Sequence, residues 1–555
     1  MPDDIAPGRS ITLDAKIAPL QPATYTLVWT MDVLDGPRFT SEGVPGPAIK
    51  FAAVNLPPQL TAESPASGAV LSSLTPTLWA TGKDADRSPS GALQYTFEVC
   101  EVEGKDARKN CRSGSRGTAE QWTVPSGWLS WSKTYAWYAY AYDGKDTSSQ
   151  PAPAYFSTQV PQPAVTGHLG GDGDREFGTR AGNYSTAATD AAIPTVGPEL
   201  SVVRNYNSLD PRTDNVFGTG WSTRWDMRAV AEDTGSVIVT TKDGSRIRYG
   251  RNADGGYAAP AGSLTTLTAD NGGGWVLRDK SAATYSFDSS GRLTKIVDGS
   301  GREQRLTYTD GKLTEARDVL SGRALSFSWS DGRVASVTTN ETGPGTAGLK
   351  WTYNYTGNRL AKVCPPASTD KCTVYEYGDG SLYRSMVLDQ NPVSYWRLGE
   401  TTGPVAASDA PSGTGLNQAV YRDVKLGSAG SVSGTSNTAA SFDGTNSYVE
   451  LPEDTIRTST LLTTELWFKT TKPGVLVGFQ DGRLADGRPD DWTPALSIDK
   501  SGKLIGQYWT GHVQPIVSTT AVTDDAWHHV ALTAAGTAQS LYLDGSLVGT
   551  LAQPH

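Results

Sequence analysis

The chain has 555 residues with 60 glycines and 33 prolines, a content of helix-breaking residues that argues against a helical bundle or coiled coil. At roughly 150 residues per domain, this length predicts three to five domains, and the 16 tryptophans and 23 tyrosines favour an all-β, multi-domain fold because aromatic side chains suit half-buried sheet surfaces. A formal net charge of −10 without a basic cluster argues against a nucleic-acid partner, and no apolar run reaches the roughly 18 residues of a membrane span.

Residues 1–57 contain two strand-like segments, one beginning at Pro22 and one between Phe39 and Val44. They resemble the last two strands of an immunoglobulin-like sandwich, so we expect the C-terminal part of such a domain. The N-terminus has neither the basic nor the apolar segment of a secretory signal, and the pattern is interrupted at His555. We therefore expect an internal fragment of a longer protein.

Residues 58–160 contain short apolar runs separated by turn signals, a pattern typical of a β-sandwich. The runs are 77–80, 95–99, 135–140 and 155–156. Their order, with Trp79 early and a turn at Trp128 before the third run, resembles fibronectin type III-like bacterial modules. The resemblance implies one sandwich domain over this range.

The four cysteines form two close pairs, Cys100 with Cys111 and Cys364 with Cys372. Each pair flanks a polar loop that a disulfide could close between neighbouring strands. A zinc site would need four converging ligands, and neither pair has the short spacing of zinc-binding cysteines. We predict two local disulfides, which indicate an oxidising environment and a secreted or cell-surface location.

Acidic and amide residues at expected strand ends are candidates for a calcium site. They are Asp84, Asp86, Asp143 and Asp146 in the second domain, and Asp443 and Asn446 near the C-terminus. Calcium prefers hard oxygen ligands of this kind. The simpler interpretation is turn formation, because Asp, Asn and Gly dominate tight turns. Apart from this calcium alternative, we expect no cofactor.

Residues 161–195 shift in composition to Gly, Pro, Thr, Ala and Asp, which predicts a linker or a loosely held strap. Within this range, Gly170 opens a stretch that begins like a calcium-binding nonapeptide repeat. Arg175 stands where a ligand Asp should be, and there is no second copy. The match therefore fails.

Residues 196–385 contain a repeat of alternating aromatic residues, a Gly-containing turn and a following Leu or Val. Its four copies begin at Tyr285, Leu306, Phe327 and Trp351. The Asp-Gly and Ser-Gly turns supply the positive φ angles of a tight turn, so each copy predicts one β-hairpin. One hairpin cannot bury its aromatic face alone, and successive hairpins should therefore form one long stacked or coiled sheet.

This repeat resembles the YD-repeat, or Rhs, family, as do the segments 196–208 and 217–221 that precede it. The resemblance implies the N-terminal scaffold of a shell that encloses a toxic C-terminal domain, or an array that presents ligands at a surface. Its partners would be the chain's own downstream repeats and C-terminal domain. The second and third copies are short, and Phe or Trp replaces the tyrosine in places.

Residues 386–555 contain five motifs in the order found in laminin-G-like, concanavalin-type jelly rolls. The motifs begin at Ser394, Ala440, Glu465, Asp525 and Leu541. We expect the last strands of such a domain to be absent from this chain, so that its aromatic core of Trp396, Trp467 and Trp527 would lack part of its cover. We expect residues 393–555 not to fold as a stable unit alone.

No catalytic motif is evident, because the sequence has neither a nucleophile elbow nor a Walker motif. The glycine spacing at 343–348 contains a proline and precedes no expected helix, so it does not predict a phosphate site. His528 and His529 are neighbours in an expected strand and should point to opposite faces, one packed and one in solvent. The tryptophans are expected to pack in cores rather than stack on sugars.

We therefore expect a non-catalytic structural and binding region, with an inserted laminin-G-like domain whose ligand is a glycan or a surface protein. One alternative is a glycan- or cell-wall-binding adhesin, in which the jelly roll binds and the repeats form a stalk. Another is an accessory region of a polysaccharide-processing enzyme.

Overall fold

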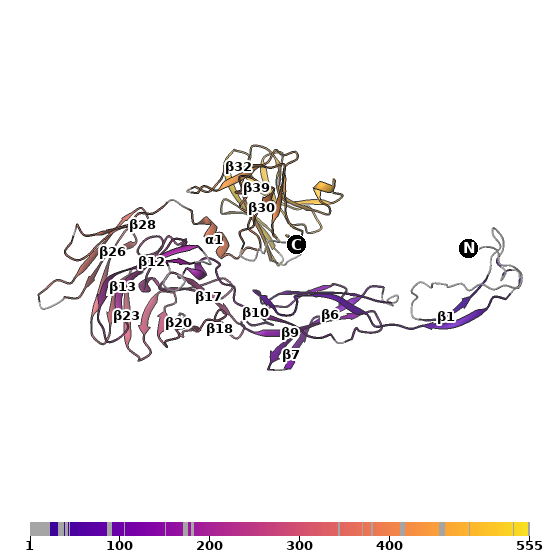
Figure 1. The fold of residues 1–555 in the computed structure, drawn as a ribbon, viewed down its shortest axis with the longest axis horizontal. Coiled ribbons are helices and arrows are strands. Elements are labelled where there is room, and N and C mark those ends of the chain that lie inside the picture. Colours follow the sequence, from indigo (N-terminus) through magenta and orange to yellow (C-terminus); the bar gives the residue numbers. More distant parts are fainter. Residues whose placement is uncertain are drawn as a thin grey trace.

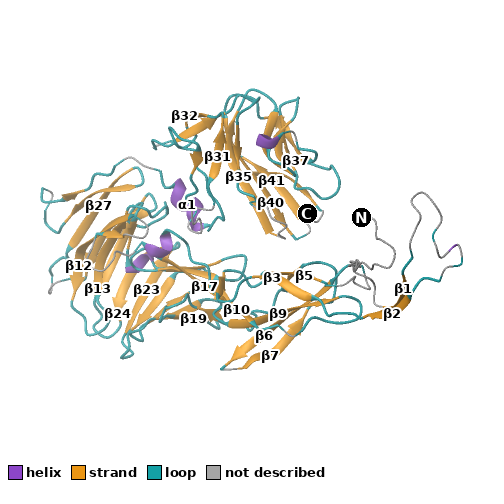
Figure 2. Ribbon diagram, turned by 45° about the vertical axis from the view of Figure 1, so that its right-hand side comes forward, coloured by secondary structure: helices purple, strands orange, loops and turns teal. Residues whose placement is uncertain are grey.

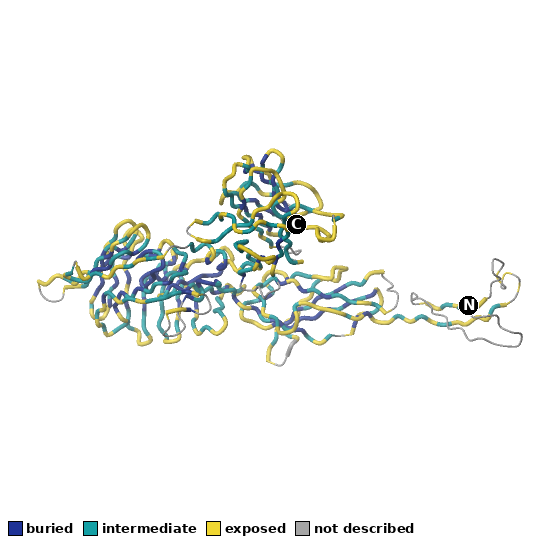
Figure 3. The backbone as a smooth tube through the Cα atoms, turned by 45° about the horizontal axis from the view of Figure 1, so that its top comes forward, coloured by how far each residue is buried: buried dark blue, intermediate teal, exposed yellow. Residues whose placement is uncertain are grey.

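The computed structural model is an elongated, almost entirely β molecule, as the sequence predicted (Figure 1). A hairpin lies at one end, followed by a sandwich and a large curved sheet, and a second sandwich lies above their junction. Buried residues are concentrated inside the two sandwiches and the curved sheet (Figure 3). The structure describes residues 23–30, 38, 41, 43, 45–85, 91–104, 106–149, 151–169, 176–178, 182–341, 345–368, 370–378, 381–410, 417–433, 435–453, 455, 461–487, 489–536 and 538–552.

The N-terminal hairpin consists of β1 (Ala23–Val28) and β2 (Ala48–Ala53), which pair antiparallel. Tyr25 stacks on Phe51 across the pair, with 5.9 Å between ring centroids. The first strand lies where the sequence predicted it. The second begins at Ala48, later than predicted, and Phe39 lies outside the described residues.

The first sandwich packs a three-stranded sheet, in the order β3-β5-β8, against a five-stranded sheet, in the order β4-β10-β9-β6-β7. Their bounds are β3 Gln59–Ser64, β4 Ala69–Leu71, β5 Thr77–Lys83, β6 Gln94–Glu103, β7 Asp106–Ser113, β8 Gln121–Thr123, β9 Thr134–Tyr142 and β10 Ala154–Thr158. Leu78 from one sheet packs in the same buried cluster as Phe97, Trp137 and Phe156 from the other. The alternation of buried and exposed residues along β6 gives this sheet one core face.

Residues 161–195 are not the linker that their composition predicted. They contain the 3-10 helix η2 (Thr166–His168), β11 (Phe177–Gly178) and the long strand β12 (Asn183–Ile193). β12 pairs antiparallel with β13 (Leu200–Asn207). Backbone pairing to a buried neighbour orders this Ala- and Thr-rich segment despite its few large apolar side chains.

The predicted stack of hairpins is confirmed as one 11-stranded sheet, in which each strand from β19 to β28 pairs with the next along the chain. Its strands are β19 Thr266–Ala269, β20 Trp275–Arg278, β21 Thr284–Phe287, β22 Leu293–Val297, β23 Glu303–Thr309, β24 Lys312–Asp318, β25 Ala324–Ser330, β26 Arg333–Thr339, β27 Lys350–Thr356, β28 Arg359–Cys364 and β29 Thr373–Val374. The sheet curves around the segment that precedes it (Figure 2). Phe217 and Trp225 of that segment share a buried cluster with Leu293, Phe327 and Tyr353 of the sheet.

The enclosed segment begins with β12 and β13 and continues through five short strands and a 3-10 helix. These are β14 Trp221–Ser222, η3 Arg224–Asp226, β15 Arg228–Ala231, β16 Val237–Thr240, β17 Arg246–Arg251 and β18 Tyr257–Ala258. β15 to β18 form a four-stranded sheet of their own. The concave side of the repeat sheet is therefore filled by protein.

The second sandwich packs the sheet β35-β40-β41-β42 against the sheet β36-β37-β38-β39, with smaller sheets β30-β31-β34 and β32-β33 beside them. The bounds are β30 Val405–Ala406, β31 Ala419–Arg422, β32 Lys425–Ala429, β33 Thr438–Ser441, β34 Tyr448–Glu450, β35 Leu461–Lys469, β36 Gly474–Gln480, η4 Leu484–Asp486, β37 Trp492–Ile498, β38 Lys503–Gly506, β39 Ile516–Ala521, β40 Trp527–Ala535, β41 Ala538–Leu543 and β42 Ser546–Leu551. Its buried core is mostly aliphatic, with Leu496, Leu504, Val530 and Leu541 at the centre.

The predicted aromatic core of this sandwich is wrong for Trp467, which is 38% exposed. Trp396 packs in a separate small cluster with Tyr421, and Trp527 is half-buried. Aliphatic residues of β37, β38, β40 and β41 meet between the two sheets and leave the tryptophans at the periphery.

Helix α1 (Tyr383–Asp389) lies between the repeat sheet and the second sandwich. The Asp389 carboxylate accepts hydrogen bonds from the N–H groups of Val165 and Thr166, at 2.9 and 3.0 Å. On the other side, Trp467 Nε1 donates to the Tyr383 hydroxyl at 3.0 Å. The helix therefore contacts both the segment at η2 and the second sandwich. Among the described residues, no helix has the length and apolar character needed to cross a bilayer.

Candidate functional site

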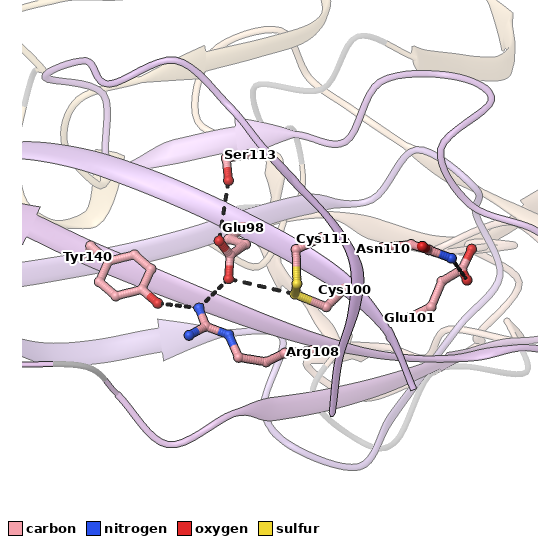
Figure 4. Close-up of a disulfide and its surroundings, with 8 residues drawn as sticks. All are labelled: Glu98, Cys100, Glu101, Arg108, Asn110, Cys111, Ser113 and Tyr140. Carbon is pink, nitrogen blue, oxygen red and sulfur yellow. Dashed lines mark hydrogen bonds and ion pairs between the residues drawn. A yellow bond between two sulfur atoms is a disulfide. The ribbon is translucent and has the colours of Figure 1, made fainter. Parts of the chain in front are cut away.

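Both predicted disulfides form, with S–S distances of 2.06 Å for Cys100–Cys111 and 2.07 Å for Cys364–Cys372. The first joins β6 to β7 beside an ion pair of Arg108 with Glu98 (Figure 4). Among the described residues, one group of three metal-capable side chains converges, namely Glu98 with these two cysteines. Because the sulfurs are bonded to each other, they supply no thiolate ligand.

Replacing both Cys100 and Cys111 with serine is expected to lower the free energy of unfolding of the first sandwich by about 2–3 kcal/mol, because the open loop gains conformational entropy in the unfolded chain. Denaturant unfolding followed by hydrogen exchange of β6 and β9 amides measures the change. The matching double substitution of Cys364 and Cys372 should leave these amides unaffected. Equal protection of the β6 amides in both variants would contradict the expectation.

Two of the predicted calcium ligands of the first sandwich, Asp143 and Asp146, are engaged in a turn. Asp143 Oδ1 accepts from the N–H groups of Lys145 and Asp146, both at 2.7 Å. Asn55 Nδ2 donates to both Asp143 Oδ2 and Asp146 Oδ2, at 2.7 and 2.8 Å. Burial alone would raise the pKa of Asp143, but these hydrogen bonds outweigh it and the pKa is lowered.

The other calcium candidates do not converge with this turn. Asp84 forms no group of three metal-capable side chains with the acids above, and Asp86 lies outside the described residues. Asp443 Oδ1 accepts from the N–H groups of Thr445, Asn446 and Ser447, and these hydrogen bonds lower its pKa. Asn446 contributes its backbone to this turn. Calcium binding stays a prediction.

The two neighbouring histidines are both half-buried, so the expectation of one packed and one solvent-exposed ring is wrong. His528 contacts Phe468 and His529 contacts Trp467, each across the β35–β40 pair. His528 Nδ1 lies 2.8 Å from Asp544 Oδ2 and its Nε2 lies 3.1 Å from Asp524 Oδ1. Burial alone would lower the pKa of His528, but the two carboxylates outweigh burial and raise it.

A raised histidine pKa makes the second sandwich more stable in mild acid. The stabilisation by protonated His528 is complete below its unfolded pKa of about 6.5 and is lost as the pH rises through the folded pKa. We expect a lower melting temperature at about pH 8.5 than at about pH 6, and a smaller difference in His528→Gln. His529→Gln, which alters the ring 3.9 Å from Glu465, is the control and should keep the difference. A wild-type difference in His528→Gln would contradict the assignment.

The repeat hairpins share one hydrogen-bond pattern that the sequence did not reveal. In each copy after the first, an aromatic side chain donates to a backbone carbonyl at the start of the return strand of the preceding copy. The pairs are Tyr308 to Leu293 (2.7 Å), Trp329 to Leu313 (2.7 Å), Tyr355 to Val334 (2.9 Å) and Tyr377 to Leu360 (2.7 Å). Tyr377 belongs to a fifth copy of the repeat, in addition to the four copies that the sequence pattern predicted.

The three tyrosine rings of this pattern also lie next to arginines of the preceding copy. Arg292 lies 5.3 Å from the Tyr308 ring centroid, and Arg359 lies 5.3 Å from that of Tyr377. A register shift occurs at the equivalent aromatic residue of successive hairpins, at Tyr308 and Trp329 among others. Each copy is therefore fixed to its predecessor by side-chain contacts as well as by strand pairing.

A hollow at one end of the sheet β36–β39 is the candidate binding site. It has a volume of about 350 Å³ and is lined by Phe479, Gln480, Asp481, Asp491, Trp492, Thr493 and Trp509. Trp492 is 57% exposed and Trp509 is 48% exposed. Exposed aromatic faces beside a few polar groups are what a ring-shaped polar ligand such as a sugar needs. We call this hollow the aromatic groove.

The exposure of Trp492 and Trp509 corrects the expectation that tryptophans lie in cores. Trp492 is the first residue of β37, and Trp509 follows the end of β38. Neither lies inside an alternating strand run, where the core argument holds. Their positions at strand ends, next to Asp491 and Tyr508, were the available signal.

A second hollow of about 460 Å³ lies where the enclosed segment, α1 and the second sandwich meet. Three of its charged lining residues are held by neighbours. Arg212 pairs with Asp210, Asp214 pairs with Arg228, and Asp389 is bound by backbone N–H groups. This hollow is therefore the less favourable site for an external ligand.

Two family models match parts of the chain. Residues 179–249 match a family described as a domain of unknown function, DUF6531, and residues 443–555 match the Concanavalin A-like lectin/glucanases superfamily. The chain contains a concanavalin-type jelly roll. The aromatic groove belongs to this jelly roll, and the segment enclosed by the repeat sheet includes most of the DUF6531 match.

Among curated proteins, the chain is 32% identical over 130 residues to the tRNA nuclease WapA of Bacillus subtilis (strain 168) and to the tRNA(Glu)-specific nuclease WapA of Bacillus subtilis subsp. natto. The match covers 23% of this chain and 5% of each relative, so the chain spans a small part of the relatives' length.

Among solved structures, Trypanosoma rangeli sialidase in complex with 2,3-difluoro-KDN is 11% identical, with 76% of this chain and 74% of that chain covered and a TM-score of 0.21. Sucrose-6-phosphate hydrolase from Lactobacillus gasseri is 10% identical, with 67% and 83% covered and a TM-score of 0.12. Likenesses this low carry no argument about activity.

Proposed function

We propose that this chain is a non-catalytic structural and binding region of a secreted or cell-surface YD-repeat protein, in which the jelly roll binds carbohydrate. The observation that carries the binding role is the pair of exposed tryptophans, Trp492 and Trp509, in the aromatic groove. Sugar rings have apolar faces that stack on such side chains. The two disulfides agree with an oxidising, extracellular setting.

The repeat sheet is the scaffold in this proposal. Its concave side is filled by the enclosed segment, and each copy is bonded to the one before it, as by Tyr355 to Val334. Such nearest-neighbour contacts suit an array that extends by adding copies. Downstream repeats and a C-terminal domain would be its partners within the same protein, as the opening part of a toxin-encasing shell.

The curated relatives are named as tRNA nucleases, and we propose that this region corresponds to a part of such a protein that does not itself act on RNA. The net charge of −10 favours this, because binding to a phosphate backbone depends on clustered Lys and Arg.

Co-sedimentation with insoluble cellulose, chitin and peptidoglycan tests the binding role. We expect the full chain to be retained by at least one of them, and Trp492→Ala/Trp509→Ala to stay in the supernatant. Phe442→Ala, which removes an exposed aromatic residue outside the aromatic groove, is the control and should bind normally. No retention on any glycan would contradict the binding role, and release of soluble sugar would favour the polysaccharide-processing alternative.

A further inference from the structure

Among the described residues that line the aromatic groove, two are carboxylates and none is basic. Asp481 and Asp491 line it, and both are exposed. Within the part of the chain that the structure describes, neither acid has an ion-pair partner; the nearby Arg483 is paired with Glu450. The aromatic groove is therefore acidic as well as aromatic.

The two acids are held next to each other by the backbone. The N–H of Asp481 donates to the carbonyl of Asp491 at 3.1 Å, which joins the end of β36 to the start of β37. In the adjoining pair of the same ladder, Gln480 lies opposite Trp492. One carboxylate therefore flanks each strand end, beside the exposed indole of Trp492.

This combination selects ligands by charge. Two neighbouring carboxylates attract a cationic group and repel an anionic one. The face of an indole ring also attracts cations, and more strongly than other aromatic rings do. A volume of about 350 Å³ is at the small end of ligand pockets, so the aromatic groove accommodates a small ligand or a short segment of a polymeric one.

We propose that the aromatic groove binds a glycan with free amino groups, of the glucosamine type, with its rings against Trp492 and Trp509 and its ammonium groups beside Asp481 and Asp491. This inference rests on the proposed carbohydrate-binding role of the jelly roll and names its ligand class. Uronic-acid and sialic-acid glycans are negatively charged, as the two carboxylates are, and are therefore repelled from the aromatic groove.

Calorimetric titration of the full chain with three hexasaccharides tests the inference. The glucosamine hexamer and the N-acetylglucosamine hexamer have the same backbone and differ in charge, and the galacturonic-acid hexamer is anionic. We expect the glucosamine hexamer to bind about tenfold more tightly than the acetylated hexamer, and the anionic hexamer not to bind. The preference should weaken as salt is added.

Asp481→Asn/Asp491→Asn should remove most of this preference while leaving the affinity for the acetylated hexamer nearly unchanged. Asp486→Asn/Asp490→Asn is the matched control, because these nearby exposed acids do not line the aromatic groove, and it should keep the preference.

Three results would overturn the inference. If the acetylated or the anionic hexamer binds as tightly as the glucosamine hexamer, or if the asparagine variant keeps the preference, the charge argument is wrong while the carbohydrate-binding role stands. If no hexamer binds and no insoluble glycan retains the chain, both proposals fail together.

Discussion

Replacing Arg204 with methionine is expected to destabilise the repeat body, the name we give to the repeat sheet together with its enclosed segment. The free energy of unfolding of the repeat body should fall by about 3–5 kcal/mol, the range found when one partner of a buried ion pair is removed. The Arg204 side chain is 1% exposed, and its Nε and Nη2 donate to Asp190 at 2.6 and 2.9 Å. The substitution would leave the Asp190 carboxylate buried without its counter-charge.

The residues around this ion pair increase the loss of stability expected from the substitution. Arg204 Nη2 also donates to the Tyr375 hydroxyl at 3.1 Å, and the Tyr353 hydroxyl donates to Asp190 at 2.9 Å. The guanidinium lies 4.6 Å from the Trp221 ring centroid. Burial alone would lower the pKa of Arg204, but Asp190 outweighs burial and the pKa is raised. The pair thus joins the enclosed segment to the last repeats of the sheet.

Denaturant unfolding monitored by hydrogen exchange of β13 and β27 amides measures this loss. Arg305→Met is the control, because Arg305 pairs with Glu303 at the surface and its loss should cost less than about 1 kcal/mol. Similar destabilisation by both substitutions would contradict a special role for the buried pair.

Leu325→Ala is expected to destabilise the repeat body by about 2–5 kcal/mol, because it removes buried methyl groups and leaves a cavity. Leu325 is 0% exposed and lies in the cluster shared by the sheet and the enclosed segment. Leu320, in the loop before the same strand, is 65% exposed.

The matched variant Leu320→Ala should change stability by no more than about 0.5 kcal/mol. The same denaturant experiment compares the two leucines. Equal effects would show that the concave face of the sheet is not packed against the enclosed segment as described.

The repeat hairpins were predictable from sequence because their turns are local. Asp310 and Gly311 adopt φ angles of 51° and 75°, and Asp331 and Gly332 adopt 49° and 76°, as a tight hairpin turn requires. The disulfides were predictable for the same reason, since each closes a short loop. Strand β12 was not, because its ordering depends on pairing with β13 rather than on its own composition.

The aromatic groove could not be predicted because three separate segments contribute to it. Phe479 ends β36, Trp492 begins β37, and Trp509 follows β38. The sequence indicates the strands, but their register and the bulges of the β36–β37 pair determine which side chains meet at the sheet end. The ring-to-carbonyl bonds of the repeats, such as Tyr308 to Leu293, likewise depend on how one copy is placed on the next.

The most direct test of the account is the affinity of the full chain for the glucosamine hexamer, measured by calorimetry beside Trp492→Ala/Trp509→Ala. Because both tryptophans are exposed, the variant should unfold at the same temperature as the wild type. We predict that the wild type binds and that the variant, equally folded, has lost measurable binding. Unchanged affinity in the folded variant would contradict the aromatic groove as the binding surface.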